Sequence, residues 1–199
     1  MTLLLGGTFN PPHNGHVALA EAARQHYGTD DLTVQVAVRP GHKEVQLPAV
    51  IRLQLARAAF PHDRVELEPH ERTVDMLQAG RWDSPPVFVI GADQFADFLT
   101  WKDPEGVLER ARLAVATRPG YPLERLEEVK QQLSRPDRVE FFELEPVPIS
   151  SREVRDRVAR GEPVDDLVPH AVARLIESLG LYRDGGYTSA VSERDPTQN

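Results

Sequence analysis

The chain has 199 residues, of which 40% are hydrophobic and 27% are charged, as expected for one soluble globular domain with a sizeable core. Its formal net charge of -8 argues against a general affinity for nucleic acids or anionic membranes. The lack of cysteine excludes disulfides and thiolate metal sites, and no apolar stretch has the length of a secretory signal or a membrane span. We therefore expect a cytoplasmic protein, and the sequence leaves its oligomeric state open.

The first 27 residues carry the most informative pattern of the chain. An apolar run at residues 3–5 predicts a buried strand, which a glycine pair and a Pro-Pro pair then interrupt. Gly6 and Gly7 allow the backbone to turn sharply and to approach a ligand, because neither carries a Cβ. A helix is expected over residues 15–27, and the N–H groups at its start favour an anion such as phosphate.

Two histidines, His13 and His16, flank this predicted phosphate site. They are three residues apart, so both rings could point at one ligand, and a histidine can donate to phosphate oxygens whether neutral or charged. A metal pair is the less favoured interpretation, because the chain has no cysteine and no acidic third ligand is near. Either histidine alone would be interpreted as a surface residue, or as a buried one with its hydrogen bonds made within the protein. The strand, the glycine turn and the start of the helix together support one phosphate site.

Strands and helices alternate along the remaining chain. The apolar patterns predict strands at 32–38, 65–67, 86–90, 113–117 and 139–144, and helices at 48–60, 73–78 (capped by Thr73), 94–110 (broken around Trp101 and Pro104), 123–133 and 168–181. This order predicts an α/β fold with a doubly wound parallel sheet. Ligands bind such sheets beyond the carboxyl ends of the strands, where the loops at 6–16, 40–43, 91–93 and from 118 onward are expected to share one crevice.

A second anion-binding pattern follows the last predicted strand. Ser150 or Ser151 can cap a helix that begins there, and Glu153 is near enough to support the cap. Arg155, one turn into the helix, can add a charge-assisted contact to an anion bound at the helix start. In isolation this pattern would indicate only a well-capped surface helix.

Both patterns resemble motifs of the nucleotidyltransferase superfamily. Residues 13–16 read H-N-G-H, which matches (T/H)-x-G-H, and residues 149–155 resemble the phosphate-clamp motif (I)-S-S-(S/T)-x-(I/V)-(R/K). Residues 91–95 followed by Trp101 are similar to the G-x-D…W element of bacterial nicotinate mononucleotide adenylyltransferases, and 118–123 to their R-P-G-Y element. Residues 165–169 and 180–183 resemble the closing segment of that family. The resemblance spans residues 3–183 and implies a Rossmann-like nucleotidyltransferase domain, which leaves residues 184–199 as a mobile tail.

The resemblance also implies which residues hold the two substrates. His13, His16 and Arg155 would be catalytic, and Mg²⁺ would be held mainly by the ATP phosphates. Trp101 would stack on the nicotinate ring of the second substrate. The other substrate-binding positions implied are Lys43, Thr73 and Arg118, and those implied for ATP are Gly6, Gly7, Thr8, Phe9, His13, His16, Asp93, Ser150, Ser151 and Arg155.

The implied reaction joins ATP to nicotinate mononucleotide, giving nicotinate adenine dinucleotide (deamido-NAD) and pyrophosphate in NAD biosynthesis. A phosphate is already an anionic nucleophile, so alignment and charge stabilisation suffice and no general base is needed. The runner-up is a sibling transferase acting on phosphopantetheine, which the Trp101 and R-P-G-Y elements disfavour. A non-catalytic nucleotide sensor is disfavoured by the intact His13, His16 and Arg155 set. A dinucleotide-binding dehydrogenase is disfavoured because G-x-G-x-x-G does not follow the first strand.

The sequence departs from the family pattern at a few positions. The tripeptide at 71–73 is Glu-Arg-Thr in place of the more usual Ser-Tyr-Thr, and Arg152 stands where the clamp motif has its third Ser or Thr. The sequence assigns no role to Glu71, Arg72 or Arg152. It also leaves open the preference between nicotinate and nicotinamide mononucleotide, which differ by one charge.

Overall fold

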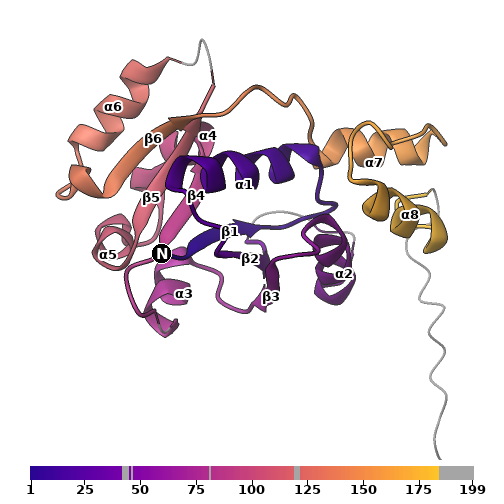
Figure 1. Cartoon of the computed structure of the whole chain (residues 1–199), viewed down its shortest axis with the longest axis horizontal. Coiled ribbons are helices and arrows are strands. Elements are labelled where there is room, and N and C mark those ends of the chain that lie inside the picture. The colour runs from indigo at the N-terminus through magenta and orange to yellow at the C-terminus, as the bar shows by residue number, and fades with distance from the viewer. Residues whose placement is uncertain (42–44, 46, 81, 119–121, 184–199) are drawn as a thin grey trace, which may run out of the picture.

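The computed structural model describes residues 1–41, 45, 47–80, 82–118 and 122–183. At its centre is a six-stranded sheet with the order β3-β2-β1-β4-β5-β6, in which all neighbouring strands are parallel (Figure 1). The strands are β1 (Leu3–Gly7), β2 (Leu32–Ala37), β3 (Arg64–Glu68), β4 (Val87–Gly91), β5 (Arg112–Thr117) and β6 (Val139–Glu143). Every predicted strand is thus confirmed. The predicted break at Gly6 and Gly7 is wrong, because both glycines pair with β2 and continue β1.

The helices also follow the predicted order. They are α1 (Asn14–Tyr27), α2 (Ala49–Ala59), α3 (Thr73–Ala79), α4 (Ala92–Ala96), α5 (Pro104–Arg110), α6 (Leu123–Gln131), α7 (Ser151–Ala159) and α8 (His170–Ser178), with 3-10 turns at Phe98–Thr100 and Pro136–Arg138. Thr73 is not the cap of α3, because the helix already begins at Thr73 and Arg72 is its N-cap. Ser150 does cap α7, since its Oγ accepts the N–H of Glu153 at 3.1 Å.

The sheet separates two apolar cores, as the period-two alternation of a strand requires. Leu3 and Leu5 of β1 face a core shared with α1, α2 and α8, whereas Leu4 faces a core shared with α3, α4, α5 and α6. Helices therefore cover both faces of a parallel sheet, and the doubly wound α/β fold is confirmed (Figure 1).

The last two helices pack on the first of these cores. Val154 of α7 and Val172 of α8 are fully buried in the cluster that contains Leu3, and α8 packs beside α2 (Figure 1). The Tyr182 hydroxyl donates to Oδ1 of the buried Asn10 at 2.9 Å. The predicted tail at 184–199 lies outside the described residues, and among the helices described none is long and apolar enough to cross a membrane.

We expect Tyr182→Phe to lower the free energy of unfolding by about 1–3 kcal/mol, because it leaves a buried amide oxygen of Asn10 without its donor. Tyr27→Phe is the matched control. Its hydroxyl donates at 3.0 Å to the half-exposed Glu140, where water can replace it, so we expect a loss below about 1 kcal/mol. Urea unfolding of both variants measures the difference, and equal losses would contradict this account.

Candidate functional site

Two cavities lie at the carboxyl edge of the sheet, on either side of the loop that joins β1 to α1. β1 has β2, the next strand in the chain, on one side and β4 on the other. In doubly wound sheets a crevice opens where the strand order reverses in this way. Gly6, Gly7 and Thr8 border a cavity of about 430 Å³. Gly15 borders a smaller one of about 200 Å³. The predicted single crevice is thus two neighbouring spaces that share this loop.

The two predicted phosphate-binding histidines lie together on the shared loop. The centroids of the His13 and His16 rings are 3.8 Å apart, and Nδ1 of His16 accepts the backbone N–H of His13 at 3.2 Å. A neutral His16 that accepts at Nδ1 carries its proton on Nε2, and this N–H can donate to an anionic oxygen. The local backbone therefore sets the tautomer that phosphate binding needs.

Burial makes His13 a neutral residue. Desolvation lowers the pKa of His13 to about 4, so the ring is uncharged at neutral pH. Its Nδ1 is buried and has no hydrogen-bond partner among the described residues. The ring also lies over Gly15, where an added Cβ would come within 3.0 Å of it. A side chain at position 15 would therefore displace the His13 ring.

A buried arginine that the sequence analysis missed holds the other side of the loop. Arg52 is 1% exposed and donates to the carbonyl oxygens of Thr8 at 2.8 Å and Ala37 at 2.7 Å, and also to those of Leu47 and Val38, both at 3.2 Å. Burial lowers the pKa of its guanidinium, which nevertheless stays charged. One signal could have found it, because position 52 falls on the apolar stripe of α2 together with residues 55, 56 and 59.

The start of α7 approaches the same loop from the far end of the chain. Ser151 Oγ donates to the carbonyl of Pro11 at 2.8 Å, and Arg155 Nη1 donates to the carbonyl of Asn10 at 2.7 Å. The motif at 149–155 therefore contacts the loop that leads into the motif at 13–16, although some 140 residues separate them. Ser150 and Arg152 are exposed, and the Oγ of Ser150 is engaged in capping the helix.

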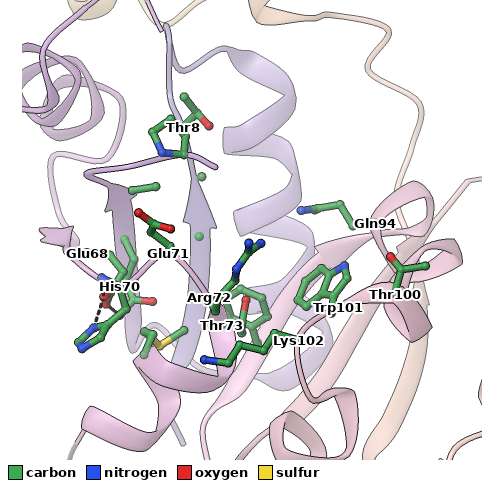
Figure 2. Close-up of a pocket in the computed structure, with 17 residues that line it drawn as sticks. Thr8, Glu68, His70, Glu71, Arg72, Thr73, Gln94, Thr100, Trp101 and Lys102 are labelled. Atoms are coloured by element: carbon green, nitrogen blue, oxygen red, sulfur yellow. Dashed lines mark hydrogen bonds and ion pairs between the residues drawn. The ribbon is translucent and has the colours of Figure 1, made fainter. Parts of the chain in front are cut away.

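The predicted substrate residues do not all line the same space. Thr73 and Trp101 border the larger cavity with Gly6 and Gly7, as expected (Figure 2). Arg118 instead borders the smaller cavity with Asp93, because it follows β5, which β4 separates from β1. That Arg118 contacts the second substrate stays a prediction. Lys43, and residues 119–121 of the R-P-G-Y element, lie outside the described residues.

The side chain of Phe9 lies in the core, whereas the resemblance implied that Phe9 lines the nucleotide site. Its side chain is 1% exposed and packs between the rings of His16, at 5.0 Å, and Phe60, at 6.1 Å. It therefore supports the position of His16 from the core side and does not line an open nucleotide site.

Several cavity residues carried no signal in the sequence. Gln35, at the carboxyl half of β2, is 4% exposed, and its Nε2 donates to Glu68 at 3.4 Å. Its Oε1 has no partner in the described part of the chain, so a buried acceptor borders the larger cavity. Only the assembled sheet brings Gln35 beside Gly6, its partner in the register of β1 and β2.

Known proteins resemble this chain over most of its length. The family model described as cytidylyltransferase-like matches residues 4–157. Proteins carrying the name "Probable nicotinate-nucleotide adenylyltransferase" are 38% identical in Thermus thermophilus and 37% identical in Bordetella avium. Both alignments cover 90% of this chain, and they cover 98% and 96% of those proteins.

Solved structures share the fold at lower identity. The Plasmodium falciparum nicotinic acid mononucleotide adenylyltransferase complexed with NaAD superposes with a TM-score of 0.73 at 14% identity, covering 91% of this chain and 96% of that one. The same enzyme complexed with APC gives a TM-score of 0.68. At this identity the likeness supports the fold alone.

We expect Arg52→Met to lower the free energy of unfolding by about 3 kcal/mol or more, because four carbonyl groups lose a charged donor in a buried position. Arg57→Met on the same helix is the control. Arg57 is exposed and makes one long contact, at 3.5 Å, so we expect a change within about 0.5 kcal/mol. Urea unfolding compares the two, and similar losses would show that Arg52 is not an anchor.

The His13 pKa predicts an acid-sensitive fold. Below pH 6.5 the unfolded chain binds a proton at this histidine that the folded chain does not take up until about pH 4. The stability contributed by neutral His13 is therefore complete above pH 6.5 and is lost as the pH falls towards 4, by about 3 kcal/mol at most. Unfolding free energies from pH 7.5 to 4 should fall less steeply in His13→Gln than in the wild type. The exposed His62→Gln should keep the wild-type slope, and parallel curves for all three proteins would refute the assignment.

Proposed function

The chain belongs to the cytidylyltransferase-like family and, within it, to the nicotinate-nucleotide adenylyltransferases, and we propose that its crevice transfers AMP from ATP to nicotinate mononucleotide. The products are nicotinate adenine dinucleotide and pyrophosphate, in NAD biosynthesis. The observation that carries this proposal is the pair of cavities on either side of one histidine-bearing loop. Two nucleotides bound there would meet with their phosphates over that loop.

In this proposal the two substrates take different cavities. The adenosine of ATP binds in the smaller cavity, near Asp93, and its phosphates lie over the histidine pair and the start of α7. Nicotinate mononucleotide binds in the larger cavity, with its ring beside Trp101. The support for this arrangement is that the larger cavity has an aromatic wall and lies in the size range of small-molecule pockets.

The reaction needs positioning more than proton transfer. A 5′-phosphate oxygen of nicotinate mononucleotide attacks the α-phosphorus of ATP and forms the new P–O bond. The bond from the α-phosphorus to the bridging oxygen breaks, and its electron pair leaves on pyrophosphate. His16 donates from Nε2 to an α-phosphate oxygen as charge develops there, and neutral His13 and Arg155 hold the phosphates in line.

Mg²⁺ enters this proposal with ATP, as part of the substrate. In the part of the chain that the structure describes, no group of three or more His, Cys, Asp and Glu residues could hold a metal ion. A magnesium ion binds through substrate phosphates and water in many nucleotide sites, where it neutralises phosphate charge. We place the reaction in the cytoplasm, where ATP is available.

We expect His16→Ala to lower kcat by about 100- to 1000-fold, because one preorganised donor to the transition state is lost. Pyrophosphate release is measured with ATP and Mg²⁺ on three acceptors: nicotinate mononucleotide, nicotinamide mononucleotide and phosphopantetheine. His62→Ala is the control, because this exposed histidine precedes β3 at the opposite edge of the sheet. Turnover of phosphopantetheine alone would indicate the sibling transferase. ATP binding without turnover of any acceptor would indicate a nucleotide sensor.

A further inference from the structure

Of the two permanently charged cations that border the larger cavity, Lys102 has a carboxylate partner and Arg72 has none among the described residues. Five charged or titratable side chains border this cavity, those of Glu68, His70, Glu71, Arg72 and Lys102. Glu68 pairs with His70 at 2.6 Å, Glu71 pairs with Arg39 at 3.7 Å, and Lys102 donates to both carboxylate oxygens of Asp75 at 2.9 Å. Within the described residues, Arg72 has no carboxylate at salt-bridge distance.

The position of Arg72 places this charge where a ligand would meet it. Arg72 is the residue before α3, and Figure 2 shows its side chain projecting into the cavity on the side of Trp101 and Gln94. An exposed guanidinium presents several N–H donors in one plane, which matches the two oxygens of a carboxylate. The cavity therefore offers a cation that an anionic group of the ligand can neutralise.

The aromatic side of the cavity, formed by Trp101, indicates which part of the ligand carries the anionic group. The Trp101 ring is held by Phe88, 6.4 Å away, and by Phe98, 5.2 Å away, both in edge-on geometry. The indole is only partly buried by these contacts and borders the cavity. A flat heteroaromatic ring can stack on such a face. A carboxylate on that ring would then lie in the space that Arg72 reaches.

We propose that Arg72 is the residue of this chain that distinguishes a carboxylate from an uncharged carboxamide on the pyridine ring of the mononucleotide. This inference rests on the proposed function, and it names the residue that sets the choice of the second substrate. The two mononucleotides share their ribose and 5′-phosphate and differ at one ring substituent. Any contact to the shared parts changes both affinities, whereas a contact to the substituent changes their ratio.

The ratio of the two dissociation constants tests the proposal. Calorimetric titrations of each mononucleotide, in the presence of a non-hydrolysable ATP analogue, compare the wild type with Arg72→Gln and Arg72→Lys. We expect Arg72→Gln to weaken nicotinate mononucleotide by about 10- to 100-fold and nicotinamide mononucleotide by less than about twofold. Arg72→Lys restores part of the ratio, because the charge remains but the planar donor pair is lost. Arg72 is exposed, so Tm should be unchanged.

Lys102→Gln is the matched control, since it removes a cation from the same cavity that Asp75 already neutralises. It should keep the wild-type ratio. Equal weakening of both mononucleotides in Arg72→Gln would mean that Arg72 contacts the shared phosphate or ribose, and would overturn the proposal. Unchanged affinities, or a wild type that binds both alike, would overturn it too. If Arg72→Gln changes the ratio of the two dissociation constants but the wild type releases no pyrophosphate, the binding specificity stands and the proposed reaction is rejected.

Discussion

The site depends on how the carbonyl groups of the β1–α1 loop are held. Arg52 binds the carbonyl of Thr8, Arg155 that of Asn10, and Ser151 that of Pro11. A carbonyl oxygen carries partial negative charge and would repel a phosphate placed beside it. With these oxygens occupied by donors on the protein side, the loop can present the histidine pair and the start of α1 to an anion. Its conformation is also fixed before any ligand binds, which reduces the entropy lost on binding.

This constraint explains why the end of the chain is part of the site. Ser151 and Arg155 reach the loop only after the chain has crossed the whole sheet, from β1 through β6. Val154 anchors their helix in the first core, and the hydrogen bond from Tyr182 to Asn10 ties the segment after α8 to the same loop. Burial raises the pKa of Tyr182 well above its usual range, so its hydroxyl keeps the proton that it donates. The C-terminal segment and the N-terminal loop therefore stabilise each other.

The sequence predicted what depends on local pattern. Strand and helix periodicity located the elements, and the motif at 149–155 does contact the loop that leads into the motif at 13–16. It could not tell which cavity Arg118 borders, because this depends on strand order, which no local pattern records. Phe9 was placed in the site by its position in the motif, but its side chain turns into the core. Arg52 was missed because a charged residue on a helix is expected to face solvent. Here the guanidinium is buried, and it donates to four backbone carbonyl groups.

The distribution of charge reconciles an acidic protein with anionic substrates. The chain carries a net charge of -8, yet Arg52, Arg72 and Arg155 lie at the crevice, and in the described ranges none of them has a carboxylate partner. At physiological ionic strength the field of surface charges fades within about 8 Å, whereas a guanidinium beneath a loop acts over hydrogen-bond distances with little screening. A net negative surface disfavours long polyanions, whose many phosphates would meet that surface, whereas a small anion within the crevice would meet the nearby cations first.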